Sequence, residues 1–146
     1  MRRIHLVHIG LSRMSTFVAG QELAPKTFII NRAKLVEYAN ASGDHNPIHQ
    51  DEAFAKSVGL ENVIAHGMYT MGLAGQYISE IAGDSSKVRE FSARFTKPVV
   101  VPAQTDVELI VSAIVAEVQS DSVKLEITAT SGDVKVLGMA KALISL

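Results

Sequence analysis

The chain of 146 residues contains no cysteine. Disulfide bonds, thiolate zinc sites, iron–sulfur clusters and cysteine nucleophiles are therefore excluded. This absence suits a reducing compartment, and we expect the protein to be cytoplasmic. An excess of one charge is also missing, since 14 basic and 15 acidic residues leave a formal net charge of −1. Without a polybasic surface, nucleic acid and anionic membranes are poor candidate partners.

Long apolar runs are missing as well, because no window approaches the roughly 20 apolar residues of a membrane-spanning helix. The sequence therefore predicts no membrane insertion. Residues 1–13 hold a short apolar stretch interrupted by two histidines, and no small-residue cleavage site follows it, unlike in a signal peptide. We expect 1–13 to be an N-terminal arm or a mis-assigned start before Met14. A single domain then covers residues 14–146.

Hydrophobic periodicity predicts mainly helices in the first half of the chain. A short strand over residues 27–30 precedes a helix that begins after Asn31, a plausible N-cap, and ends near Gly43. A helical turn follows at 51–57. A long, nearly uncharged helix is expected over about 66–82, and because it has no polar stripe we expect it to be buried on nearly every side.

The second half of the chain alternates apolar and polar residues, which is typical of strands with one buried and one solvent-facing surface. We expect strands over 88–98, 105–115, 123–129 and 134–144, with a turn at residues 131–133. Consecutive strands of this kind form an antiparallel meander. The sequence thus predicts an α+β fold in which an antiparallel β-sheet wraps around one central apolar α-helix.

One polar cluster, residues 42–51, gathers groups that can move protons. Asp44 and His49 are five positions apart with Pro47 between them, so a rigid turn can bring a carboxylate and an imidazole together for general acid–base catalysis. Asn46 could hydrogen-bond to one partner and fix its orientation. In the competing interpretation the segment is a plain turn, and Asp44 only caps the backbone.

A metal site is a weaker alternative for the same region. Its possible ligands are acidic and imidazole side chains, namely Asp44, His45, His49, Asp51 and His66. They do not lie on one helix at i, i+4 spacing as in a zinc motif, so we expect no metal there.

A second feature stands where an irregular segment leads into the apolar helix, at Ala65-His66-Gly67-Met68. Free backbone N–H groups at a helix start carry partial positive charge, and Gly67 has no side chain to keep a ligand away from them. Such amides could polarise a carbonyl and stabilise an enolate. In the alternative interpretation Gly67 only permits tight packing, and His66 caps the preceding loop.

Together these two segments resemble a known family. The run from Tyr38 to His49, YANASGDHNPIH, is similar to the hydratase-2 motif of the MaoC-like dehydratases, the (R)-specific enoyl-thioester hydratases of the hot-dog fold. Ile64-Ala65-His66-Gly67-Met68 resembles the segment before their central helix. The likeness covers nearly all of 15–146, including the strand RFTKPV at 94–99. The chain is most similar to the catalytic B-type subunits of actinobacterial (3R)-hydroxyacyl-acyl-carrier-protein dehydratases.

The resemblance implies reversible syn loss of water from (3R)-hydroxyacyl thioesters, carried on CoA or acyl carrier protein, in fatty-acid elongation. It assigns Asp44 and His49 as the catalytic pair, Asn46 as a supporting residue, and the Gly67 amide as donor to the thioester carbonyl. It implies no metal and no redox cofactor. It also implies a dimer, either of identical subunits or with a related hot-dog subunit.

One position departs from the family pattern. Some single-domain members have a serine eight residues after the helix glycine, where this chain has Gly75. A hydroxyl contact is then missing, and Gly75 could instead leave room for a long acyl chain. Two other functions stay open: an acyl-thioesterase of the same fold, and a non-catalytic acyl-binding subunit that completes a partner's site. The turn with Asp44 and His49 favours the dehydratase over both.

Overall fold

The structure, a computed structural model, describes residues 16–146. The predicted N-terminal arm over 1–13 and the start at Met14 lie outside the described residues. The elements in chain order are β1 (Glu22–Ile30), α1 (Arg32–Ser42), η1 (Pro47–His49), α2 (Glu52–Ser57), α3 (Gly67–Ala82), η2 (Ser85–Lys87), β2 (Val88–Phe95), β3 (Val107–Val118), β4 (Ser122–Ser131) and β5 (Val134–Ser145). The predicted α+β class is confirmed.

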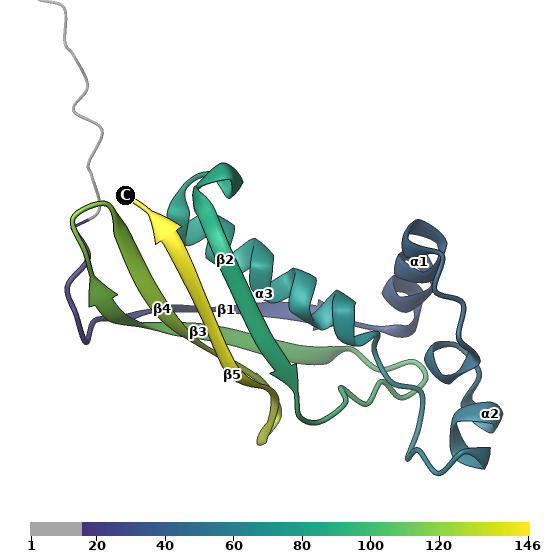
Figure 1. Cartoon of the computed structure of the whole chain (residues 1–146). Coiled ribbons are helices and arrows are strands. Elements are labelled where there is room, and N and C mark those ends of the chain that lie inside the picture. Colours follow the sequence, from purple (N-terminus) through teal and green to yellow (C-terminus); the bar gives the residue numbers. More distant parts are fainter. Residues whose placement is uncertain (1–15) are drawn as a thin grey trace, which may run out of the picture.

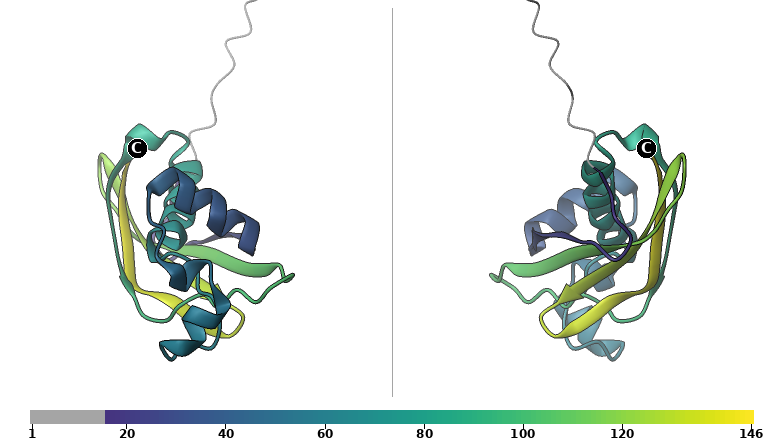
Figure 2. Two further views of the ribbon diagram at one scale, coloured as in Figure 1. Left: turned by 90° about the vertical axis from the view of Figure 1, so that its right-hand side faces the viewer. Right: turned by 90° about the vertical axis from the view of Figure 1, so that its left-hand side faces the viewer.

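Five strands form one sheet in the order β1-β3-β4-β5-β2 (Figure 1). Every pairing is antiparallel. The strands β3, β4 and β5 follow one another as the predicted meander, while β1 and β2 form the two edges. Viewed from its two ends, the sheet curves around α3 (Figure 2). The expected sheet wrapped around a central helix is therefore confirmed.

The core lies between the concave face of the sheet and α3. Alternate residues of the central strands are buried and the residues between them are mostly exposed, as the predicted alternation requires. From α3, Ala74 and Ile78 pack against this face. The buried apolar residues of β3 and β4 are Leu109, Val111, Ala113, Val115, Val123, Leu125, Ile127 and Ala129.

Helix α3 begins and ends within one residue of the prediction, but its burial differs. Its buried residues are Thr70, Ala74, Tyr77 and Ile78, which share one face of the helix. Met68 lies on another side and is 59% exposed. The expectation of burial on nearly every side is therefore wrong for a single chain, and an apolar part of α3 stays open to solvent. Within residues 16–146, no helix combines the length and the apolar character needed to cross a membrane.

Strand β1 is longer than predicted, since it begins at Glu22 and contains Pro25. A proline cannot donate a ladder hydrogen bond, which is why it suggested a boundary. Here it is tolerated because β1 is an edge strand, and its register against β3 shifts between Leu23 and Lys26.

Candidate active site

The turn after α1 sets the position of Asp44. The preceding Gly43 ends the helix with φ of 79°, a conformation that side chains rarely adopt. One carboxylate oxygen of Asp44 accepts the amide of Asn46 at 3.2 Å, and the side-chain oxygen of Asn46 accepts the amide of Ile48 at 3.2 Å. Asp44 thus does cap the backbone, as the plain-turn interpretation expects, while its side chain stays exposed.

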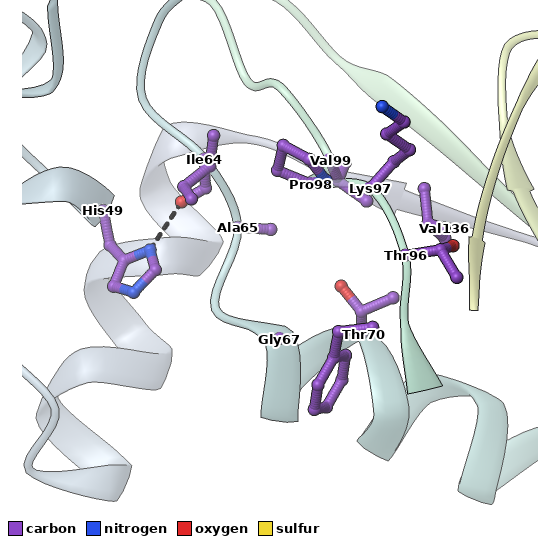
Figure 3. Close-up of a pocket in the computed structure, with 11 residues that line it drawn as sticks. His49, Ile64, Ala65, Gly67, Thr70, Thr96, Lys97, Pro98, Val99 and Val136 are labelled. Atoms are coloured by element: carbon purple, nitrogen blue, oxygen red, sulfur yellow. Dashed lines mark hydrogen bonds between the residues drawn. The ribbon is translucent and has the colours of Figure 1, made fainter. Parts of the chain in front are cut away.

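His49 lies at the end of this turn and is only 7% exposed. Its Nδ1 donates to the carbonyl oxygen of Ile64 at 2.7 Å (Figure 3). Because a carbonyl only accepts, we assign the ring proton to Nδ1, and Nε2 keeps its lone pair. Burial holds the pKa of His49 below its usual value of 6.5, and His66 lowers it further. The Ile64 bond and the charge of Asp44 act in the opposite direction. The neutral ring with a bare Nε2 is therefore favoured near pH 7.

The structure brings Asp44 and His49 together, and adds His66 to them. One carboxylate oxygen and one nitrogen of each ring lie within 4.8 Å of one another. The two imidazoles stack with ring centroids 3.8 Å apart and planes 25° apart. His66 is 2% exposed, and its Nε2 donates to the backbone oxygen of Asp44 at 3.0 Å. This contact could not be predicted from the sequence, because 22 positions separate the two residues.

The same three residues are a poor fit for a metal ion. His49 Nδ1 and His66 Nε2 already bond to carbonyls, and the stacked rings hold their remaining lone pairs in nearly parallel planes instead of directing them at one point. The other two candidate ligands lie elsewhere. Asp51 caps α2 by accepting the amide of Phe54 at 3.0 Å, and His45 is exposed.

A cavity of about 350 Å³ opens between His49 and the start of α3 (Figure 3). Most of the residues that line it are apolar, and Thr70 and Lys97 are among the few polar ones. Asp44 does not line the cavity itself, but its carboxylate lies next to His49, which does. The lining consists of His49, Ile64, Ala65, Gly67, Thr70, Phe95, Thr96, Lys97, Pro98, Val99 and Val136.

Gly67 begins α3 at the edge of this cavity. The amides of Gly67 and Met68 have no acceptor inside the helix, because its first carbonyl, that of His66, accepts from Tyr69 and Thr70. A Cβ at Gly67 would stand 3.2 Å from Cε1 of Phe95. The tight-packing interpretation of this glycine is therefore confirmed, while access of a ligand to the amides stays a prediction. The role of Phe95 was missed, because a phenylalanine late in a strand carries no signal for such a contact.

Gly75 lies further along α3 and is not part of the cavity lining. A Cβ there would stand 3.9 Å from the ring of Phe91, which is ordinary van der Waals contact. Room for an acyl chain at Gly75 stays a prediction, separate from this cavity.

The sequence pattern of MaoC-like domains matches residues 16–133 of the chain. Among curated proteins, 3-hydroxyacyl-thioester dehydratase X of Mycobacterium tuberculosis is 43% identical over 74 residues, which are 51% of this chain and 25% of that protein. This chain spans a quarter or less of the length of such curated relatives.

Solved structures extend the likeness to most of the chain. A MaoC-like dehydratase superposes with a TM-score of 0.85 and 33% identity, over 88% of this chain and 40% of the other. The R-hydratase PhaJ1 from Pseudomonas aeruginosa superposes with a TM-score of 0.75 and 27% identity, over 88% of this chain and 81% of the other. The hot-dog fold expected from the sequence is thereby confirmed.

Proposed function

The chain belongs to the MaoC-like domain family, and from this premise we propose that it dehydrates (3R)-hydroxyacyl thioesters to trans-2-enoyl thioesters and catalyses the reverse hydration. One observation carries the proposal. His49 and Gly67, distant from each other in sequence, line one mainly apolar cavity, and the carboxylate of Asp44 lies beside His49. The names of the relatives, dehydratases and hydratases of acyl thioesters, support the same reaction.

The dehydration requires three contributions from the protein: a proton acceptor, a proton donor and stabilisation of the enolate. In dehydration the Cα–H and Cβ–O bonds break, a carbon–carbon double bond forms, and the hydroxyl leaves as water with one proton added. One group must accept the α-proton, and one must protonate the leaving hydroxyl. The amides must stabilise the enolate that forms on the thioester carbonyl. No electrons pass to another molecule, so we propose no redox cofactor. We propose no metal either, because His49 Nδ1 and His66 Nε2 already bond to carbonyls.

His49 and Asp44 supply the proton transfers as a pair. The bare Nε2 of His49 is an acceptor, and its lowered pKa keeps it unprotonated near neutral pH. The exposed carboxylate of Asp44 is the second group. Because the two interact closely, we treat them as one coupled acid–base unit, in which the proton accepted from Cα is the proton returned to the leaving hydroxyl. Asn46 supports them by holding the turn, and the amides of Gly67 and Met68 face the carbonyl.

The substrate carrier and the subunit partner are parts of the same proposal. The acyl chain occupies the apolar cavity, while CoA or acyl carrier protein holds it from outside. We propose that a second hot-dog subunit, identical or related, covers the open side of α3 and the free edge at β2. Met68 and Phe95 support this, since they are 59% and 54% exposed at that place. Light scattering on the purified protein, alone and with partners that co-purify from the native host, measures the assembly.

Crotonyl-CoA tests the reaction directly. We expect the enoyl absorbance to disappear without release of free CoA thiol. Thiol release would instead establish an acyl-thioesterase. If neither hydration nor thiol release occurs, with the purified protein alone and with its co-purified partners, the protein would be a non-catalytic acyl-binding subunit. Substrates of increasing chain length, on CoA and on acyl carrier protein, then define the preferred acyl group and carrier.

A further inference from the structure

Two crossed hydrogen bonds join the catalytic turn to the segment before α3. His49 in the turn donates to the carbonyl of Ile64, and His66 in the segment donates back to the carbonyl of Asp44. The two rings stack between these bonds at 3.8 Å. We name this arrangement the histidine clasp: His49, His66 and the carbonyls of Asp44 and Ile64.

His66 is the member of the clasp that reaches every part of the site. It fixes the backbone of Asp44 through its Nε2, and it supports the ring of His49 through its face. It also directly precedes Gly67, the first residue of α3. On its other side the ring packs against Tyr38, with centroids 4.8 Å apart. A displacement of His66 therefore moves all three groups that the proposed reaction needs.

The second nitrogen of His66 is exceptional. Its Nδ1 is buried and has no hydrogen-bond partner among the described residues. Leaving a buried polar atom unpaired costs free energy of folding. Stability alone therefore does not explain a histidine at position 66. The functional part of the His66 ring is the N–H at Nε2, because the Asp44 carbonyl requires a hydrogen-bond donor.

We propose that His66 is a positioning residue of the active site. It holds Asp44, His49 and the Gly67 amide in their reactive arrangement and does not itself touch the substrate. This inference rests on the proposed hydratase function. It predicts that loss of the Nε2 donor lowers kcat, while substrate affinity and the stability of the fold are retained.

Two variants separate the parts of this role. His66→Phe keeps a flat ring against His49 and removes the donor, as well as the unpaired nitrogen. We expect kcat to fall about tenfold to a hundredfold, since small misplacements of reacting groups have effects of this size. The value of KM should stay within about threefold, because binding in the cavity is not altered. His66→Gln restores an N–H donor near the Nε2 position and should recover most of the lost kcat.

Tyr77→Phe is the matched control. Tyr77 is a buried ring residue of α3, and its hydroxyl donates to the carbonyl of Ala24 at 2.9 Å, outside the cavity lining. Both substitutions thus remove one bond to a carbonyl and keep the ring. We expect Tyr77→Phe to leave kcat unchanged, and His66→Phe to keep Tm within roughly 4 °C of the wild type. Wild-type kcat in His66→Phe would overturn the proposal. So would a loss of Tm in both His66 variants that parallels their loss of kcat.

Nitrogen NMR of the histidines tests positioning without any substrate. In the wild type we expect His49 protonated at Nδ1 and His66 at Nε2. In His66→Phe the Nδ1 proton of His49 should persist, because the Ile64 carbonyl holds it, while the backbone amide signals of Asn46 and Ile48 should shift once the Asp44 carbonyl loses its donor. Unchanged amide signals of this turn would overturn the positioning role even if the wild type hydrates no enoyl thioester. Absence of turnover in the wild type, with the tautomers as expected, would instead refute only the proposed function.

Discussion

The concave face of the sheet and the histidine clasp hold their residues in place by different interactions. On the sheet, side chains such as Leu109 and Leu125 are fixed by apolar packing from many directions at once. In the clasp, two hydrogen bonds to carbonyls and one ring stack fix the geometry. Loss of one packing contact lowers the stability of the fold by a limited amount. Loss of one clasp bond instead changes the positions of the reacting groups. Stability and activity should therefore respond to different substitutions.

The largest effect is expected from the catalytic pair. Asp44→Asn and His49→Gln should each lower kcat/KM by about 10²- to 10⁴-fold, because each removes a proton-transfer group. This corresponds to about 3 to 5 kcal/mol of activation free energy. Thermal unfolding should show little change in Tm, since Asp44 is exposed and His49 keeps a similar shape as glutamine. Full crotonyl-CoA hydration by either variant would remove that residue from the proposed mechanism.

A substitution in the core should produce the opposite pattern. Leu125 of β4 is 1% exposed, and Leu125→Ala should lower the free energy of unfolding by about 2–5 kcal/mol. Urea unfolding measures this loss. The kcat of the folded fraction should stay at the wild-type value, because the clasp does not depend on that side chain. A comparable loss of kcat in the folded variant would show that core and site are coupled, and would break the comparison.

Two glycines of α3 sharpen the contrast within one helix. Gly67→Ala places a methyl group 3.2 Å from Phe95, so the ring must shift at the cavity edge. We expect kcat/KM to fall about tenfold, which is roughly 1.4 kcal/mol. Gly75→Ala meets the Phe91 ring at 3.9 Å and should leave hydration of the short-chain crotonyl-CoA unchanged, with stability raised by up to about 1 kcal/mol from helix propensity. Equal kinetics in the two variants would contradict the role of the Gly67 amide.

The pH dependence should be the mildest of these effects. Because the pKa of folded His49 lies below 6.5, the unfolded chain binds a proton more readily between that pKa and pH 6.5. Stability is then fully present above pH 6.5 and falls as the pH drops through this window. The acid limb of kcat/KM should lie in the same window. NMR titration of His49 provides the midpoint, and His49→Gln should abolish this part of the stability change. A midpoint at or above 6.5 would contradict the burial argument.

Most of the fold could be predicted because its signals are local. Alternation gave the strands β2 to β5, and Asn31 and Gly43 marked both ends of α1. The errors arise where tertiary context decides. Pro25 indicated a strand boundary, yet an irregular edge strand accommodates it. The uncharged sequence of α3 indicated complete burial, yet one chain covers only one of its faces.

In the site as well, only the local contacts could be predicted from the sequence. The approach of Asp44 to His49 follows from their spacing within one rigid turn. The contacts of His66 and Phe95 do not follow from spacing, because they join segments that only the folded chain brings together. The buried, unpaired Nδ1 of His66 marks a special position, and it arises only from the tertiary packing around that ring.

The bonds of the clasp close short loops, of 15 and 22 residues, while β1 pairs Glu22 with Ile114 of β3. Since the entropy lost on closing a loop grows with its length, the clasp can re-form after opening at a smaller entropic cost than the sheet edge. Hydrogen exchange should detect this as local opening. The Ile64 amide, bonded to Ile48 at 3.2 Å, should exchange faster than the amides of β4. Under the proposed hydratase function, this local opening would let acyl chains enter and leave while the strands stay paired.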